Sequence, residues 1–181
     1  AEKCCVLNLK TKGDALPYFV DDKNINLFTS HNVFSEIVIH SRYEILLENY
    51  IKTINIEALT MIDMTKQEII PAIIYYQSDL SELVSKKQSL KTKFSSVLEE
   101  NLLDKVSKLA ESLYYDLETL EKSLVESGSK TDVLQKAKFY KEKVYLNMIT
   151  LRGDVDELEM IIAKDYWPYP SYAEMLYSVK Y

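Results

Sequence analysis

Only three glycines and four prolines interrupt this chain of 181 residues, and their scarcity leaves few places at which it can turn. From Ser35 to about Leu90 the chain has no glycine and one proline, Pro71. Apolar residues recur there at steps of three and four, among them Leu47, Tyr50, Ile54, Ala58 and Met61. We therefore predict one very long helix over residues 35–90, or two helices that meet at a kink. Because proline clashes with the preceding turn, we expect a kink near Ile70, whose form the sequence leaves open.

Two later segments show the alternating steps of three and four that mark a coiled-coil seam. The first seam consists of Leu103, Val106, Ala110, Leu113, Leu117, Leu120 and Leu124, and the second of Val144, Met148, Leu151, Val155, Leu158 and Ile162. Gly128 ends the first helix, and Thr131 or Asp132 starts the next. We predict an antiparallel helical hairpin over residues 96–165, which opens with a capping box of Ser96 and Glu99. Gly153, inside the second arm, indicates either a close helix contact or local fraying.

The two ends of the chain differ from the predicted bundle. Residues 1–34 are predicted to hold an irregular leader over residues 1–20, with a turn near Gly13 and Pro17, and then a short helix through Phe28 that Asp21 or Asp22 caps. Residues 166–181 form an aromatic tail, in which Ser171 and Glu174 have the spacing of another capping box. Such a tail packs in a groove, either on this chain or on a partner, and both alternatives stay open. The predicted fold class is all-α, with long helices in bundle-type packing.

Composition excludes several classes of protein. A net charge of −6 and a pI near 5.1 argue against binding to nucleic acid, which needs clustered lysine and arginine. No apolar run approaches the roughly 18–20 residues that cross a bilayer, so we expect no membrane partner and a cytoplasmic protein. Cys4 and Cys5 are neighbours and are expected to be reduced thiols. The chain opens with Ala-Glu-Lys and no initiator methionine, which suggests a piece of a longer protein.

No catalytic, cofactor-binding or metal-binding set emerges from the sequence. The glycines are too isolated to form a phosphate loop, and His31 and His40 lack the i, i+4 spacing of paired metal ligands. The sharpest enzyme hypothesis is a di-metal site built from Glu44, Glu48, Glu57 and Asp63. No Glu-x-x-His pair accompanies these carboxylates, so they are interpreted as a solvated face.

One stretch has specific polar residues at positions where a plain amphipathic helix would accept any polar residue. It is SRYEILLENYIKTINIEALTMIDM, at residues 41–64. It resembles the opening of the carboxy-terminal helical domain of type III glutamine synthetases, a bacterial form of the enzyme. Further segments agree in order, namely LNLKT (7–11), DALP (14–17), HNVF (31–34), IIPA (69–72), VDELE (155–159) and YWPYPSYAEML (166–176). The resemblance therefore covers nearly the whole chain.

The resemblance implies a parent enzyme of nitrogen metabolism that joins glutamate and ammonia with ATP and a divalent metal. It places the metal, nucleotide and glutamate ligands in an upstream α/β catalytic domain of the same chain, within a ring-shaped homo-oligomer. Residues 35–181 would then be a helical accessory domain without cofactor or activity of its own.

Two hypotheses remain: a non-catalytic structural and assembly domain of that ligase, or a free-standing helical interaction module of coiled-coil or sensor-bundle type. The first needs docking groups, and we expect them at Arg42, Glu44, Lys52, Asn55, Glu57, Trp167 and Tyr169.

Overall fold

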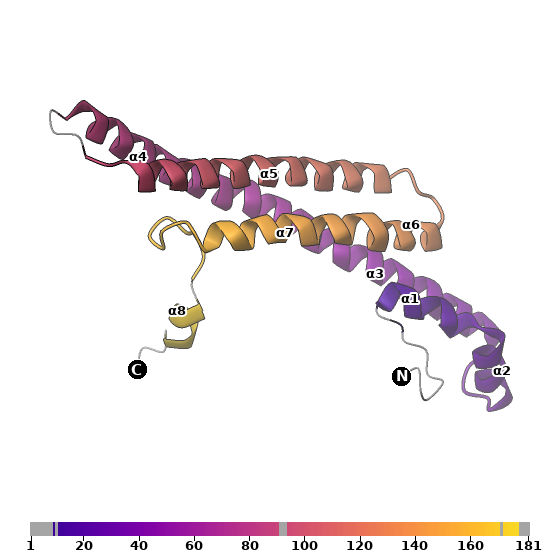
Figure 1. The fold of residues 1–181 in the computed structure, drawn as a ribbon. Coiled ribbons are helices and arrows are strands. Elements are labelled where there is room, and N and C mark those ends of the chain that lie inside the picture. The colour runs from indigo at the N-terminus through magenta and orange to yellow at the C-terminus, as the bar shows by residue number, and fades with distance from the viewer. Residues whose placement is uncertain (1–8, 10, 91–93, 171, 178–181) are drawn as a thin grey trace, which may run out of the picture. The chain divides into compact units, whose positions relative to one another are not determined.

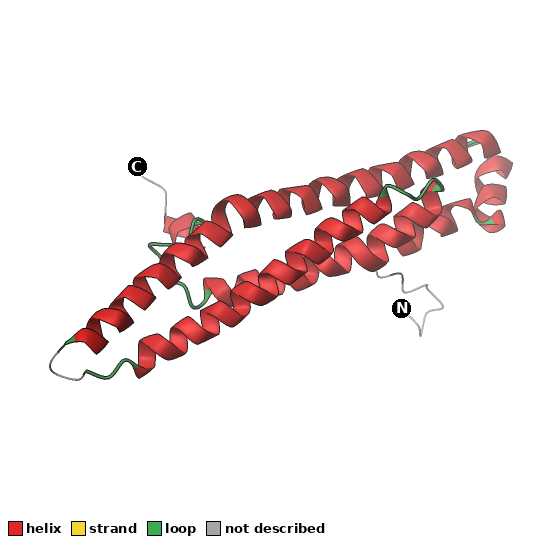
Figure 2. Cartoon of the chain, turned by 90° about the horizontal axis from the view of Figure 1, so that it is seen from above, coloured by secondary structure: helices red, strands yellow, loops and turns green. Residues whose placement is uncertain are grey.

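The computed structural model describes residues 9, 11–90, 94–170 and 172–177, and every regular element within them is a helix (Figure 2). This result confirms the all-α prediction. The predictions for Cys4, Cys5 and a cap at Ser171 fall outside the described residues. In chain order (Figure 1) the elements are α1 (Lys12–Ala15), the 3-10 helix η2 (Leu16–Val20), α2 (Asp22–Ser30), α3 (Glu36–Met64), the π-helical turn η3 (Thr65–Ile69), α4 (Ile70–Ser89), α5 (Val97–Ser127), α6 (Val133–Phe139), the π-helical turn η4 (Tyr140–Val144), α7 (Tyr145–Glu159) and α8 (Tyr172–Tyr177).

The chain divides into two compact units, each built from segments that lie far apart in the sequence. Unit 1 comprises residues 1–58 and 122–146, and unit 2 comprises residues 59–121 and 147–181. The division falls within α3, α5 and α7 rather than between elements. The boundary between residues 34 and 35, which was drawn from sequence pattern, stays a prediction.

Unit 1 has its core along the first part of α3. The buried apolar residues are Leu16, Ile39, Leu47, Ile51, Ile54, Ala58, Ala137, Tyr140 and Val144. The prediction of an irregular leader up to residue 20 is wrong from Lys12 onward, because α1 and η2 are helical. The Thr11 hydroxyl oxygen accepts the backbone N–H of Asp14 at 3.2 Å, and Pro17 lies in the first turn of η2, where its fixed φ suits a helix.

The end of α2 turns the chain into α3 through a Schellman motif. Asn32 has a φ of 54°, in the left-handed region that asparagine tolerates better than most residues. The N–H of Val33 donates to the carbonyl of Phe28 at 2.9 Å, and the N–H of Asn32 donates to that of Thr29 at 3.1 Å. These bonds satisfy two carbonyls at the end of α2 and fix the direction in which Phe34 leaves the turn.

In unit 2 both predicted seams are largely buried. The buried members are Val106, Leu113, Leu117 and Leu120 on α5, with Met148, Leu151 and Leu158 on α7 and Ile162 just after it. Figures 1 and 2 show the unit 2 parts of α5 and α7 running side by side. The end of α3, η3 and α4 contribute further buried residues to this unit, namely Ile62, Ile69, Ala72, Ile73 and Leu80.

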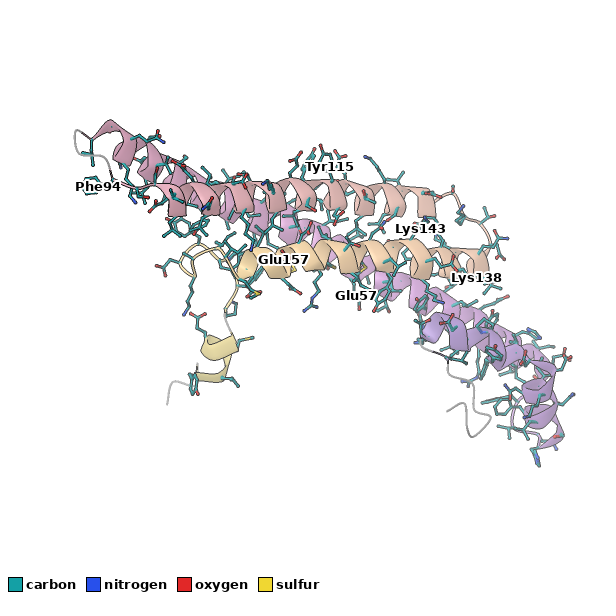
Figure 3. The ribbon with its side chains drawn as sticks, viewed as in Figure 1. Glu57, Phe94, Tyr115, Lys138, Lys143 and Glu157 are labelled. Atoms are coloured by element: carbon teal, nitrogen blue, oxygen red, sulfur yellow. The ribbon has the colours of Figure 1, made fainter. Side chains whose placement is uncertain are left out.

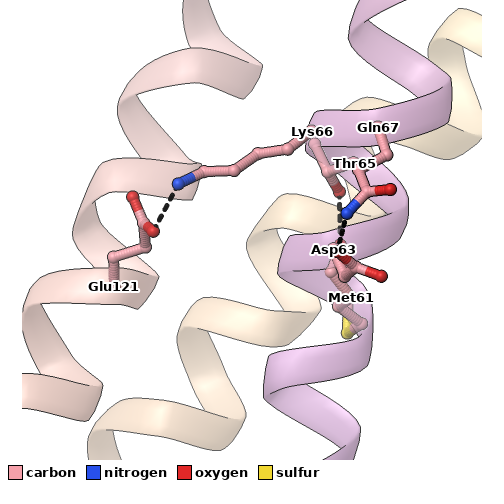
Figure 4. A network of polar contacts seen from close by, with 6 residues as sticks. All are labelled: Met61, Asp63, Thr65, Lys66, Gln67 and Glu121. Atoms are coloured by element: carbon pink, nitrogen blue, oxygen red, sulfur yellow. Dashed lines mark hydrogen bonds and ion pairs between the residues drawn. The ribbon is translucent and has the colours of Figure 1, made fainter.

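The irregularity predicted near Ile70 takes the form of the π-helical turn η3. The N–H of Ile70 reaches back five residues to the carbonyl of Thr65, and Pro71 follows at the start of α4. A π turn is one of the recognised ways in which a helix accommodates such a disturbance. Polar contacts surround this turn: the Thr65 hydroxyl donates to the Met61 carbonyl at 2.7 Å, and Lys66 pairs with Glu121 of α5 at 2.6 Å (Figure 4).

Several local predictions need correction. The Ser96 hydroxyl donates to the Glu100 carboxylate, and the Glu99 carboxylate, which a capping box would turn back toward Ser96, is held by Lys87 at 2.7 Å. This pairing lowers the pKa of Glu99, chiefly through the hydrogen bond from Lys87. The second arm is not one regular helix up to residue 165, since η4 interrupts it and α7 ends at Glu159.

Neither alternative offered for Gly153 holds. A Cβ built on it meets nothing within 4 Å, so no close helix contact requires a glycine there. The residue also lies inside the regular helix α7, which does not fray at this position.

Candidate docking surfaces

The first surface is an apolar groove on unit 1 that the predicted residue Arg42 borders. Three phenylalanines form a ladder below it: the ring centroids of Phe19 and Phe28 lie 6.1 Å apart, and those of Phe28 and Phe34 5.7 Å apart. The Arg42 guanidinium carbon lies 4.6 Å from the centroid of the Phe34 ring, a cation–π distance. The groove has a volume of about 700 Å³ and is lined by Phe19, Phe34, Ile37, Val38, Ser41, Arg42, Ile45 and Leu46.

Sequence reasoning predicted Arg42 and missed the apolar residues beside it. The HNVF motif at residues 31–34 could have predicted part of the groove. It contains Asn32, which ends α2, and Phe34, whose ring lies under the Arg42 guanidinium. Ile37 and Ile45 carry no comparable signal, because an apolar residue on a long helix is normally assigned to the core.

The other predicted residues of α3 lie in different surroundings of unit 1. Lys52 is exposed, pairs with Glu48 at 3.1 Å and borders a hollow of about 360 Å³ that Lys130 and Lys136 also line. Glu57 is exposed (Figure 3) and lines a hollow of about 330 Å³ with Lys12. Glu44 is exposed as well. The structure therefore does not bring these side chains together at one site.

Asn55 has a partner inside unit 1. Its Oδ1 accepts a hydrogen bond of 2.9 Å from the hydroxyl of buried Tyr140, and the Ser127 hydroxyl lies 3.1 Å from that same phenol oxygen. Ser127 also reaches the Leu124 carbonyl at 2.7 Å, so its single proton serves one acceptor at a time. The amide of Asn55 thus joins α3 to η4.

A second polar contact ties the leader to η4. Lys141 pairs with Asp14 of α1, and Thr11 donates a hydrogen bond to the same carboxylate at 2.8 Å. These hydrogen bonds, with the contribution from Lys141 the larger, lower the pKa of Asp14. The leader is therefore fixed to the helix that carries Tyr140.

The first part of the aromatic tail makes contacts within unit 2, whereas Met175, Leu176 and Tyr177 of α8 are exposed. The ring of Tyr166 meets that of Tyr76 edge-on, with 5.3 Å between centroids, and its hydroxyl donates to Asp79. Trp167 and Tyr169 are half-buried and lie edge to face at 6.5 Å between centroids. Together with Lys164 and Glu174, which form an ion pair of 2.8 Å, they line a hollow of about 500 Å³.

Tyr169 is the most strongly perturbed titratable group in the described chain. Burial, followed by the nearby carboxylates of Glu68 and Asp63, raises the pKa of Tyr169 to about 12. Its buried phenol oxygen lies close to Glu68 but makes no hydrogen bond of regular geometry. Tyr169 is therefore a neutral packing residue at physiological pH.

The acidic residues do not form a recognisable metal centre within the described residues, where no group of three or more histidine, cysteine, aspartate or glutamate side chains is placed to share an ion. The carboxylates of Asp116 on α5 and Asp154 on α7 are close enough for their charges to interact. Desolvation, and then the charge of Asp154, raises the pKa of Asp116. Among the described helices none is long and apolar enough to cross a membrane.

Comparison with known proteins gives a consistent result. The family model described as glutamine synthetase C-terminal domain matches residues 1–88. A glutamine synthetase of Butyrivibrio fibrisolvens is 38% identical over 173 residues, covering 96% of this chain and 25% of the relative. The type-3 glutamine synthetase of Dictyostelium discoideum is 30% identical, covering 94% of this chain and 24% of the relative. A glutamine synthetase of Bacteroides fragilis (strain YCH46) is 24% identical, covering 91% and 23%.

The chain spans about a quarter of the length of the curated relatives it matches. The matches nevertheless cover both units, since each extends over more than nine-tenths of this chain. They confirm the resemblance that the polar block and the ordered motifs suggested, including its type III character in one relative. Over residues 1–88 the chain belongs to the glutamine synthetase C-terminal domain family, and nearly its whole length is similar to part of glutamine synthetases, a type-3 enzyme among them.

Proposed function

We propose that this chain is the non-catalytic structural and assembly domain of a type III glutamine synthetase, and that it works by packing against the catalytic part of the same polypeptide. The observation that carries the proposal is the match of nearly the whole chain to about a quarter of each relative. The parent enzyme would be a cytoplasmic homo-oligomer that makes glutamine from glutamate, ammonia and ATP with a divalent metal.

The distribution of the polar groups on α3 supports a docking role. Arg42, Lys52 and Glu57 border three different hollows of unit 1, so the helix offers contact groups on several sides. A solvated surface helix needs no such arrangement. Polar groups that pair across a junction between domains supply orientation, and charge-assisted hydrogen bonds are the stronger ones.

The alternative of a free-standing interaction module is less well supported. A coiled-coil module has no need of the specific 41–64 block or of the aromatic tail, whereas the relatives match across both. We therefore favour the ligase domain.

Two measurements test the proposal. The isolated chain, supplied with glutamate, ammonia, ATP and magnesium, should form no glutamine, and metal-dependent turnover that survives rigorous purification would overturn the non-catalytic assignment. The parent enzyme from which this domain has been deleted should lose assembly, as measured by its size in solution. Normal assembly of that deletion would overturn the structural role.

A further inference from the structure

The apolar groove of unit 1 has a shape and chemistry that specify what binds there. We propose that it holds an apolar segment from the preceding part of the parent enzyme, and that a carboxylate of this segment pairs with Arg42. This inference rests on the proposed function and deepens it, because it names the surface and the chemistry of the contact.

Apolar side chains in the groove are open to solvent. Ile37, Val38 and Ile45 are 82%, 39% and 54% exposed, although all three line one groove. Exposed aliphatic residues are common singly, but a cluster in a hollow marks an interaction site. The volume of about 700 Å³ has room for several side chains of a partner segment.

Arg42 supplies the charged group of the groove. Its guanidinium lies over the Phe34 ring, and it forms no ion pair with any residue in the described part of the chain. The lining residues of the groove include no carboxylate. An arginine that stacks on an aromatic ring still presents planar N–H donors, which match a carboxylate in a two-point contact. The groove therefore selects an apolar segment with an acidic residue.

Local structure holds the groove in place. The Schellman motif at Asn32 and the ladder of Phe19, Phe28 and Phe34 fix the floor on which Arg42 rests. A preformed site loses less conformational freedom when it binds than a mobile one does.

The occupant is a segment of the same polypeptide. The matched relatives are about four times as long as this chain, so most of such an enzyme lies outside the match. A segment of the same polypeptide is held near unit 1 by the chain itself and has a high effective concentration. If the groove instead bound the same groove of a second copy, two Arg42 side chains would meet without a carboxylate. Such a pairing of like charges is unfavourable.

The test is photo-crosslinking in the full-length parent enzyme. A photo-crosslinking residue replaces Ile37, whose side chain is 82% exposed, so this position tolerates replacement without loss of the fold. A second probe replaces Glu57, which lies outside the groove. We expect the Ile37 probe to crosslink to a peptide of the preceding part that contains aspartate or glutamate beside apolar residues.

A pair of matched variants accompanies the probe. Ile45→Asp places a charge in the groove, and Ile74→Asp makes the same change at a residue of α4 that is 57% exposed, against 54% for Ile45. The crosslink from position 37 should be lost in Ile45→Asp and kept in Ile74→Asp. An unchanged crosslink in Ile45→Asp contradicts the proposal.

The remaining outcomes separate this inference from the proposed function. A crosslink from position 37 to residues 34–46 of another copy overturns the occupant, because the groove then joins two copies. If the Ile37 probe reaches nothing while the Glu57 probe reaches the preceding part, the groove proposal fails and the docking function stands. If neither probe reaches the preceding part, both fail.

Discussion

At the scale of single residues, the Tyr140 hydroxyl is a junction of unit 1. It joins Asn55 of α3 to η4 and lies beside Ser127 at the end of α5, in surroundings where Tyr140 is 3% exposed. A buried polar group of this kind stabilises the fold only while its partners are present, because an orphaned acceptor carries its full desolvation cost.

Tyr140→Phe should therefore destabilise the chain by about 1–2 kcal/mol, since it leaves Asn55 Oδ1 without its donor. Urea unfolding measures the difference. Tyr75→Phe, at a tyrosine that is 67% exposed, serves as the control and should leave the midpoint unchanged. If the two variants unfold alike, the Tyr140 bond contributes nothing to stability.

Gly153→Ala should stabilise the chain by about 0.5–1 kcal/mol, because alanine has the higher helix propensity and loses less conformational entropy on folding. The added methyl group meets no atom within 4 Å. The matched change Gly128→Ala should give no such gain, since its Cβ would lie 3.2 Å from the Val125 carbonyl oxygen. Thermal unfolding of both variants measures the effect, and a lower midpoint for Gly153→Ala would contradict it.

At the scale of elements, the Schellman motif connects the sequence to the groove. The turn at Asn32 ends α2 and places the Phe34 ring against the Arg42 guanidinium. One residue in the left-handed region therefore helps to position both of these groove residues. Phe34 in turn packs on Phe28, which keeps the start of α3 against α2.

Asn32→Ala should cost about 1 kcal/mol, because alanine tolerates the left-handed conformation less well, whereas Asn32→Gly should be neutral or stabilising. Unfolding of the chain with each substitution checks the order of stability. Equal stability of the alanine and glycine variants would show that the positive φ is not held in solution.

The prediction that the two seams face each other is tested by Leu117→Asp. Leu117 is 2% exposed, so the substitution buries an unpaired charge and should destabilise the chain by at least about 3 kcal/mol. Tyr115→Asp, on the same helix at a residue that is 58% exposed (Figure 3), should cost little. An unchanged melting temperature for Leu117→Asp would mean that the seam is exposed in solution.

The helices were largely predictable because their signals are local. The stop at Gly128, the Asp132 cap, whose side chain accepts the Gln135 N–H at 2.7 Å, and the seam spacings all act within a few residues. The two π turns were harder. Pro71 indicated an irregularity near η3, whereas η4 contains no proline or glycine that would indicate one. Helix α1 was missed because its Thr11 cap lies in a segment whose Gly13 and Pro17 predicted a turn.

The docking role of the predicted residues stays a prediction, and their surroundings were predictable only in part, because sequence pattern gives the type of a side chain but not its partner. Arg42 and Glu57 are exposed as a docking role requires, while Asn55 bonds to a residue 85 positions away. The groove depends on Phe19, Phe34 and Ile45, which come together only when η2 and α3 pack in unit 1. Such contacts are properties of the tertiary structure.

At the scale of the whole molecule, the chain consists of two units whose cores are apolar and whose polar groups are mostly paired along helices. Several hollows lie on the described residues of each unit. Under the proposed function, damage to the surface around Arg42 and Glu57 changes assembly.

The most direct test of that claim introduces Arg42→Ala and Glu57→Ala separately into the full-length enzyme. Arg152→Ala and Glu157→Ala, at exposed residues of α7 outside the predicted docking set, are the matched controls (Figure 3 labels Glu57 and Glu157). Assembly is measured by particle size, and turnover is measured per assembled particle. The account predicts that Arg42→Ala and Glu57→Ala reduce assembly while particles that still form keep normal turnover. Full assembly with lower turnover per particle would place α3 at the active site and contradict the account.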